Sequence, residues 1–470
     1  MDEDELRTHD ASRPEQVRRA HRPLRSSTSK RLPRTRMTRK IMRPPRSNRA
    51  KDRAGTRSAQ KSGIVSPTTR VMRFRSRAMA LPLSLLAPVT DHPILSWTDA
   101  SSEPPGATAH TALWRSEAGT PPPKRVMVAD DRITADTAYR QACEGTAILW
   151  RGDFQNARQL LQAMSRRVDR KPRKAATSPI DAFNLHRQAQ SQRARTLGML
   201  LIPLDADYTI PLRRAPDVRE ACTEAYGAGE AASVVSLREL LGLIGAHEWR
   251  KKGVDIPALG GARIHPHYGV FSPVRGEYVD LVANAPLPSQ ALAFDIGTGT
   301  GTGVLAAVLA KRGVKRVVGT DQDARALACA HENLARLGLQ SQVEVIDADL
   351  FPEGRAPLIV CNPPWLPARP SSPIERAVYD PDSRMLRGFL DGLAAHLEPN
   401  GEGWLILSDF AEHLGLRTRE ALLAMIDAAG LRVVGRDDIK PKHPKASDAD
   451  DPLYQARAAE VTSLWRLKAR

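Results

Sequence analysis

Cysteine is scarce in this chain, and long apolar runs are missing. The 470 residues include four cysteines and no C-x-x-C pair, so neither a disulfide framework nor a cysteine zinc site is expected, and a reducing, cytoplasmic environment fits. His265 and His267 flank Pro266 with no evident carboxylate or thiol partner, so no metal site is predicted there. No apolar stretch approaches the roughly 18–20 residues that cross a bilayer. The sequence predicts a soluble protein without a membrane partner.

Excess charge is also missing from most of the chain. The sequence has 70 Lys and Arg against 53 Asp and Glu. The first 80 residues hold 23 of the basic and 7 of the acidic residues, which leaves 47 against 46 in the remainder. Because the bulk of the chain is close to neutral, its net charge gives no support for nucleic-acid binding by the folded part.

Residues 1–126 lack periodic apolar positions. Arg, Ser, Pro and Thr dominate, as in RPLRSSTSKRLPRTRMTRK, and this composition is typical of disorder. One interpretation is a basic arm that holds RNA or another polyanion through its phosphates. The other, which we favour, is that native translation begins near Met127, where compact sequence starts. We predict a disordered basic extension over 1–126.

Residues 127–255 predict a mostly helical domain that docks the substrate. Asp153 can cap one helix, Ser178-Pro179 opens another, and Ser236 begins a capping-box pattern. The stretch MLLIPL (199–204) favours a strand between them. A basic linker, SRRVDRKPRK (165–174), is either a solvated loop or a docking patch for RNA or an acidic protein surface.

Residues 256–470 alternate strand and helix patterns. Strand-like runs such as ALAFDI, VKRVVGTD, LIVCN and GWLILSD are separated by helical segments such as ARALACAHENLARLG. This alternation predicts an α/β domain with a parallel, Rossmann-like sheet and helices on both faces.

The first of these strands runs into a glycine-rich turn, FDIGTGTGTGVLAA. Asp295 closes the strand, and Gly297, Gly299 and Gly301 let the backbone turn tightly beneath a ligand. A G-x-G-x-x-G dinucleotide fingerprint is not complete here, because Thr302 and Val304 stand where a third glycine is required. A carboxylate beside the turn also suits an ammonium group better than a pyrophosphate.

Two further acidic residues end the next two strands. Asp321 closes VVGTD, where a carboxylate can accept both hydroxyls of a ribose. Asp349 follows VIDA, where it can accept from an adenine amino group, whereas Asp323 is expected to cap a helix. Three acids at successive strand ends after a glycine turn indicate a pocket for adenosine with a cationic amino-acid tail. That ligand is S-adenosylmethionine.

The fourth strand ends in Asn362, Pro363, Pro364 and Trp365, within LIVCNPPWLPARP. Two prolines stop strand pairing and fix the backbone. The Asn362 side-chain oxygen and the Pro363 carbonyl can then accept both hydrogens of a planar amino group. Holding the nitrogen in this way frees its lone pair for attack on a sulfonium methyl. Trp365 offers a flat face for stacking.

Together these motifs resemble class I S-adenosylmethionine-dependent methyltransferases, over residues from about 265 to 470. The resemblance is to the N-P-P-[FYW] branch, which includes release-factor glutamine methyltransferases, adenine-N6 methyltransferases and small methyltransferase domains acting on guanine in ribosomal RNA. It implies a seven-stranded sheet, cofactor contacts from the glycine turn and the three acids, and catalysis at 362–365. Upstream, YGVFSPVRGEYVDLV resembles the segment that closes over the cofactor, which implies that Phe271, Arg275 and Glu277 line the site. This sequence has Trp where Tyr or Phe is usual, and the resemblance does not extend to the domain at 127–255.

Two acceptor classes and one alternative function remain open from the sequence. A protein glutamine fits the near-neutral body and the separate domain. A nucleobase in RNA or DNA fits the basic linker and Trp365 as a stacking platform. The alternative is a non-catalytic nucleotide- or RNA-binding module that keeps the fold, against which the intact N-P-P-W motif speaks.

Overall fold

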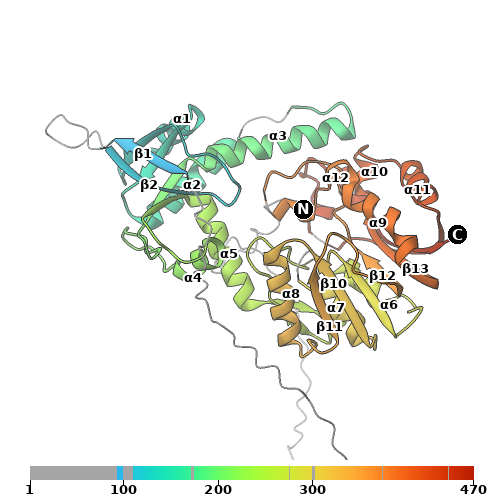
Figure 1. Ribbon diagram of the computed structural model, residues 1–470. Helices are drawn as coiled ribbons and strands as arrows, with labels where there is room; N and C mark the ends of the chain where they lie inside the picture. The colour runs from blue at the N-terminus through green and yellow to red at the C-terminus, as the bar shows by residue number, and fades with distance from the viewer. Residues whose placement is uncertain are drawn as a thin grey trace, which may run out of the picture. The chain divides into compact units, whose positions relative to one another are not determined.

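Two sheets with separate cores organise the chain (Figure 1). The computed structural model describes residues 93–98, 109–170, 174–274, 276–298, 302–372, 374–442 and 444–470. We call residues 93–256, which carry the first sheet, the N-terminal region, and residues 277–470, which carry the second, the C-terminal region. No helix among the described residues is long and apolar enough to cross a membrane.

The N-terminal region contains a six-stranded mixed sheet. Its strands are β1 (Ile94–Thr98), β2 (Ala109–Arg115), β3 (Arg125–Ala129), β4 (Thr146–Trp150), β5 (Leu200–Leu204) and β6 (Ser233–Ser236), in the order β1-β2-β6-β5-β4-β3. Its helices are α1 (Ala135–Cys143), α2 (Phe154–Asp169), α3 (Pro179–Leu197), α4 (Arg219–Tyr226) and α5 (Leu237–Lys252). A short hairpin follows, made of β7 (Val254–Ile256), η1 (Pro257–Leu259) and β8 (Ala262–Ile264).

The two faces of this sheet bury different residues of the same strand. In β4, Ile148 and Trp150 pack with the helices, whereas Ala147 and Leu149 pack against Leu95 of β1 and its neighbours. This period of two is what a strand that is buried on both faces requires. The sheet therefore has a core on each side.

These strands correct two expectations. The predicted disordered extension ran to residue 126, but β1, β2 and the start of β3 lie inside it; residues 1–92 are outside the described residues. Leu95 and Trp114 are only 1% and 5% exposed, and β2 is held by parallel pairing with β6, more than 100 residues away. The region is also not simply helical, because its helices pack on a sheet. Such long-range pairing leaves little periodic signal in the local sequence.

The local helix signals give mixed results. Asp153 caps α2 by accepting from the Gln155 N–H, and Ser178 caps α3 by accepting from the Asp181 N–H, as predicted. Ser236 precedes α5 but makes no side-chain cap bond. The expected basic linker is partly helix, because α2 continues to Asp169.

The C-terminal region contains a seven-stranded sheet in the order β11-β10-β9-β12-β13-β15-β14, in which β15 alone runs antiparallel to its neighbours. The predicted Rossmann-like seven-stranded fold is confirmed. Its strands are β9 (Leu292–Ile296), β10 (Arg316–Asp321), β11 (Val343–Asp347), β12 (Ala356–Cys361), β13 (Leu397–Ser408), β14 (Leu431–Ile439) and β15 (Thr462–Ala469). Its helices are α6 (Glu277–Asn284), α7 (Val304–Lys311), α8 (Ala324–Arg336), α9 (Arg384–His396), α10 (Phe410–His413), α11 (Arg419–Ala428) and α12 (Tyr454–Ala459), with short helices η2 (Ile374–Ala377), η3 (Pro381–Ser383) and η4 (Pro444–Ser447).

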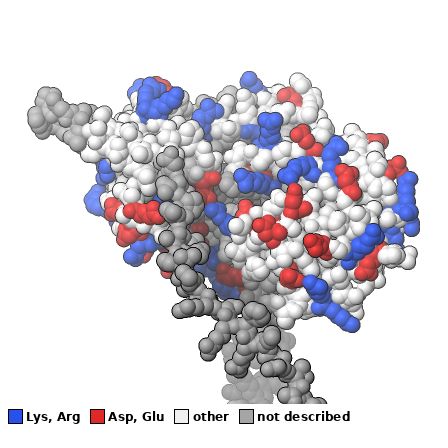
Figure 2. Space-filling view, in the orientation of Figure 1, with Lys and Arg blue, Asp and Glu red and all other residues white. Residues whose placement is uncertain are grey.

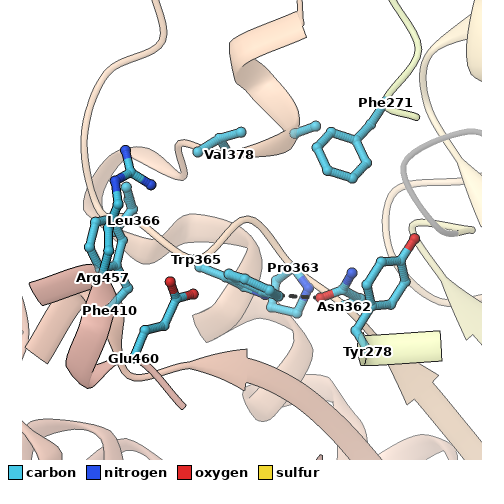
Figure 3. Close-up of a pocket in the computed structure, with 11 residues that line it drawn as sticks. Phe271, Tyr278, Asn362, Pro363, Trp365, Leu366, Val378, Phe410, Arg457 and Glu460 are labelled. Carbon is cyan, nitrogen blue, oxygen red and sulfur yellow. Dashed lines mark hydrogen bonds between the residues drawn. The ribbon is translucent and has the colours of Figure 1, made fainter. Parts of the chain in front are cut away.

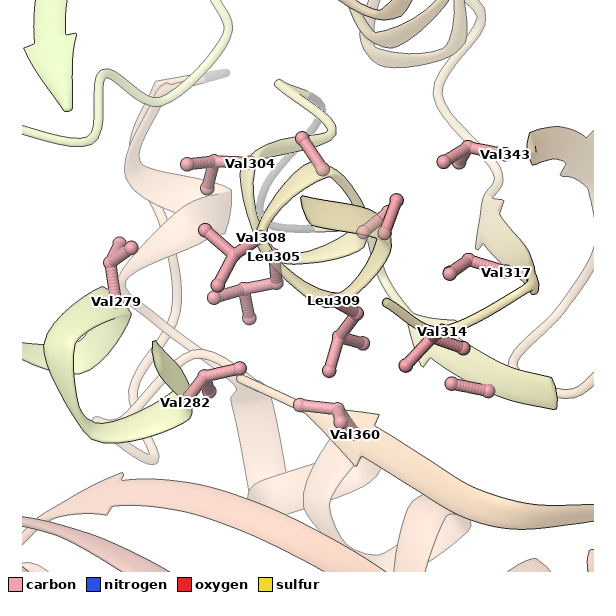
Figure 4. Close-up of a cluster of buried hydrophobic side chains, with 14 of the residues drawn as sticks. Val279, Val282, Val304, Leu305, Val308, Leu309, Val314, Val317, Val343 and Val360 are labelled. Carbon is pink, nitrogen blue, oxygen red and sulfur yellow. The ribbon is translucent and has the colours of Figure 1, made fainter. Parts of the chain in front are cut away.

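Helices cover both faces of this sheet. On one face, α6 and α7 pack beside each other against the strands, with Val304, Val308 and Leu309 of α7 pointing into the shared core (Figure 4). On the other face, α9 and α11 bury a second set of apolar side chains, including Phe389 and Leu422. The carboxyl ends of the parallel strands are thus left at one edge, where ligands bind in such folds.

Candidate active site

Strand register places two predicted site residues side by side. Asp295 of β9 pairs with Val360 of β12, and Ile296 pairs with Cys361, so Asn362 follows at the same edge as the glycine turn. Along β12, Leu358 and Val360 belong to the α7 side of the sheet, and Ile359 and Cys361 to the other. Continuing this alternation puts Asn362 on the side where Asp295 lies. The glycine turn and the N-P-P-W corner are therefore adjacent.

The glycine turn is only partly described. Gly297 has a φ of +68°, which favours glycine, and a Cβ at this position would lie 2.4 Å from the Met385 methyl group of α9. Gly299 and Gly301 lie outside the described residues. After the turn, the buried helix α7 begins at Val304.

Asp295 is completely buried, and its two carboxylate oxygens have different surroundings. Oδ2 accepts from the Thr298 hydroxyl and from the Ala306 N–H of α7, each at 3.0 Å. Oδ1 is buried and has no hydrogen-bond partner among the described residues. Burial raises the pKa of the Asp295 carboxyl to about 7. A buried acceptor without a donor fits a ligand that brings one, and the ammonium group of S-adenosylmethionine is such a donor.

The other two acids lie at the same edge and differ in exposure. Asp321 closes β10 and accepts from the N–H groups of Gln322 and Asp323 through Oδ1, and burial raises the pKa of its carboxyl. Asp323 caps α8, as expected. Asp349 follows β11 with a side chain that is 61% exposed and 3.4 Å from Arg384. Asp321 is thus the more enclosed of the two predicted adenosine contacts.

The N-P-P-W corner lines a pocket (Figure 3). Asn362 is 9% exposed, and its Oδ1 accepts from the Trp365 indole N–H at 2.9 Å. Pro363 lies beside Asn362, and Phe271 faces this group from the segment before α6. Because an amide oxygen has two lone pairs, Asn362 Oδ1 can accept a second hydrogen bond from a ligand.

Several other residues line this pocket but were not predicted from the sequence. Tyr278 of α6 stands beside Asn362, while Phe410 of α10, Arg457 of α12 and Glu460 lie beyond Trp365 (Figure 3). Arg457 and Glu460 are 3% and 1% exposed. Arg457 pairs with the nearby Asp451 at 3.2 Å and lies 5.2 Å from the ring centre of Phe410, whereas Glu460 accepts from the hydroxyl of the distant Ser408 at 2.7 Å. Only the tertiary fold makes such buried charges recognisable.

The segment before α6 gives a divided result. Phe271 lines the pocket, whereas Arg275 lies outside the described residues. The Glu277 carboxylate accepts from the backbone N–H of Lys442 at 2.5 Å, so it holds the loop after β14. The site role that the resemblance implies for Glu277 stays a prediction.

His267 does find partners in three dimensions. Its Nε2 lies 2.7 Å from the Glu332 carboxylate, which also pairs with Arg250 and Arg336. Burial lowers the pKa of His267. Because two arginines already share that carboxylate, the cluster is an ion-pair network between α5 and α8.

This geometry agrees with the comparisons with known proteins. Residues 262–415 match the methyltransferase small domain. The resemblance inferred from the sequence is confirmed for this segment, which holds the glycine turn, the three acids and the N-P-P-W corner. Helix α3 and the pocket residues Arg457 and Glu460 lie outside the methyltransferase small-domain segment.

Relatives match over part of their length. The release factor glutamine methyltransferase of Caulobacter vibrioides is 35% identical over 143 residues, which are 29% of this chain and 49% of that protein. That of Cereibacter sphaeroides is 32% identical over 171 residues, 33% of this chain and 58% of that protein. The ribosomal protein L11 methyltransferase of Vibrio cholerae is 37% identical over 98 residues, 20% of this chain and 33% of that protein. The chain thus spans about half the length of the first two relatives.

Solved structures are similar at a lower level. A methyltransferase from Pyrococcus furiosus is 19% identical to this chain. The alignment covers 50% of this chain and 99% of the Pyrococcus furiosus chain, with a TM-score of 0.34.

Proposed function

We propose that this protein is an S-adenosylmethionine-dependent N-methyltransferase whose acceptor is the side-chain amide of a protein glutamine. The observation that carries the proposal is the adjacency of Asp295 and Asn362 at one edge and on one side of the sheet. Two relatives named release factor glutamine methyltransferase support the choice of acceptor. A cytoplasmic location belongs to the same proposal.

The residues of the chain have distinct tasks in this proposal. Asp295 binds the cofactor's ammonium group, and Asp321 binds the ribose hydroxyls. Bound S-adenosylmethionine supplies a methyl group on a cationic sulfur, and the sulfur keeps the electron pair of the broken bond. Asn362 Oδ1 and the Pro363 carbonyl accept the two amide hydrogens, and the nitrogen lone pair forms the new bond to carbon. The nitrogen then releases one proton to water. Positioning and electrostatics carry the catalysis.

A nucleobase is the second candidate acceptor, because aromatic side chains line the pocket. Trp365, Phe271 and Phe410 offer flat faces on which a base can stack. Surface charge favours the protein acceptor instead. Over the described residues visible in Figure 2, Lys and Arg side chains are interspersed with Asp and Glu, whereas phosphate binding favours a basic stripe.

Label transfer separates these possibilities. The full chain is incubated with methyl-labelled S-adenosylmethionine and an extract from cells that lack the gene. The proposal expects label in protein that protease removes and RNase does not. In the control, Asn362→Ala lowers transfer at least a hundredfold while cofactor affinity stays unchanged. Label in nucleic acid selects the second candidate, and cofactor binding without any transfer selects a non-catalytic module.

A further inference from the structure

Tyr278 carries a buried hydroxyl that no described residue of the protein pairs with. The side chain is 3% exposed, and its oxygen has no hydrogen-bond partner among the described residues. Buried hydroxyls are nearly always hydrogen-bonded, because leaving one unpaired costs free energy of about 1–3 kcal/mol. Such a group persists at a site where a ligand supplies the missing partner.

The position of Tyr278 identifies which ligand that is. It lines the pocket together with Asn362 and Pro363, and its ring lies directly beside the Asn362 amide (Figure 3). Burial raises the pKa of Tyr278 above its ordinary value, and the negative charge of Asp295 adds to this effect. The hydroxyl therefore keeps its proton at neutral pH and is available as a donor.

The pocket otherwise offers acceptors at this end. Asn362 Oδ1 and the Pro363 carbonyl suit the two hydrogens of an amino group, but neither can donate to the neighbouring atom of the ligand. In a primary carboxamide that neighbouring atom is a carbonyl oxygen. We propose that the Tyr278 hydroxyl donates a hydrogen bond to the carbonyl oxygen of the acceptor amide and thereby selects a carboxamide over an amine. This inference rests on the proposed function.

A second buried tyrosine provides a matched control. Tyr208, in the N-terminal region, is 1% exposed and also has a hydroxyl without a hydrogen-bond partner among the described residues. It does not line the pocket. Tyr278→Phe and Tyr208→Phe each remove one hydroxyl that no described residue pairs with, without changing the packed ring, so neither variant is expected to lower the melting temperature.

The experiment measures three quantities for wild type and both variants of the full chain: melting temperature, S-adenosylmethionine affinity, and label transfer to the extract from cells lacking the gene. We expect both variants to melt at or above the wild-type temperature and to bind the cofactor normally. Transfer is expected to fall about tenfold in Tyr278→Phe, the effect of one lost hydrogen bond, and to stay unchanged in Tyr208→Phe.

Two results overturn the inference. One is transfer by Tyr278→Phe within twofold of wild type. The other is a loss of cofactor affinity in Tyr278→Phe with normal transfer at saturating cofactor, which assigns the hydroxyl to the cofactor. A wild-type protein that transfers no methyl group contradicts the proposed function itself, and the melting and cofactor-binding data then still report on folding.

Discussion

At the scale of single residues, Asn362 and Trp365 form a coupled pair. The indole N–H donates to the side-chain oxygen that is proposed to hold the acceptor. This bond fixes which end of the Asn362 amide faces the pocket. Tyr or Phe, which are usual at this position in the branch that the sequence resembles, have no indole N–H to make it.

Removing the indole N–H tests this coupling. Trp365→Phe keeps a flat ring but frees the Asn362 amide to rotate, so we expect the initial rate of methyl transfer to fall about threefold to tenfold. Trp365→Ala also removes the stacking surface, so we expect it to lower the initial rate of methyl transfer further. A faster Trp365→Phe enzyme contradicts this account, because it means that the indole competes with the acceptor.

Asp295 predicts a pH dependence of both stability and cofactor affinity. Its folded-state pKa is about 7, above the ordinary value near 4. Between these values the folded protein without cofactor holds a proton that the unfolded chain has lost, so this group makes stability fall as pH rises from about 4 to about 7. Binding a cationic ligand needs the ionised form. Cofactor affinity should therefore be about tenfold weaker at pH 6 than at its plateau above pH 7.

Calorimetric titration with S-adenosylmethionine at several pH values measures this dependence. The Asp295→Asn variant is expected to bind S-adenosylmethionine weakly at every pH tested, and its affinity should no longer change with pH. A wild-type affinity that does not change between pH 6 and 8 means that Asp295 is already ionised before binding.

At the scale of elements, helix α3 of the N-terminal region braces one wall of the pocket. Arg187 donates to the Arg369 carbonyl at 2.7 Å, lies 3.5 Å from the Glu375 carboxylate, and stacks 4.2 Å from the Tyr379 ring centre. Phe183 packs against the same tyrosine. The loop after the N-P-P-W corner thus depends on a helix outside the methyltransferase small-domain segment.

Trypsin reports directly on this loop. Arg187→Ala should speed cleavage after Arg376 and raise the acceptor KM several-fold, with cofactor affinity unchanged. Arg193, on the same helix, pairs with Asp169 of α2, so Arg193→Ala is the matched control and should leave the loop protected. Equal cleavage rates in the two variants rule out a bracing role for Arg187.

The sequence predicts elements well where the signal is local. The N-cap residues Asp153, Ser178 and Asp323, the glycine turn and the Asn-Pro-Pro-Trp corner each follow from a few neighbouring residues. The glycine turn and the Asn-Pro-Pro-Trp corner meet at one edge because their strands run parallel. Strands β1 and β2 were missed, because β2 is held by the distant strand β6, and β1 pairs in turn with β2.

The pocket wall was also missed from the sequence. A buried arginine such as Arg457 looks like a surface residue until the ring of the distant Phe410 is found beside its guanidinium. Tyr278 looks like an ordinary core aromatic residue until its hydroxyl is found without a partner. Both properties depend on tertiary contacts, which local residue patterns do not specify.

At the scale of the whole molecule, truncation tests which N-terminal residues the folded protein needs for stability. A chain that begins at Asp91 keeps β1 and β2, and we expect it to melt cooperatively like the full chain. A chain that begins at Met127 lacks both strands and the first two residues of β3. It uncovers the sheet face around Leu149 and Leu201, so we expect a lower melting temperature or aggregation.

Circular dichroism melts of the two truncated chains provide the measurement. Normal melting of the Met127 chain contradicts the assignment of β1 and β2 to the folded N-terminal region. Loss of folding in the Asp91 chain means instead that residues 1–90 contribute to stability.

The most direct test is to locate the transferred methyl group by tandem mass spectrometry of the protein that takes up label. The account predicts one added methyl on the side-chain nitrogen of a glutamine, formed by the wild-type protein and absent with Asn362→Ala. A methyl group on a nucleobase, or on a lysine or carboxylate of the labelled protein, contradicts it.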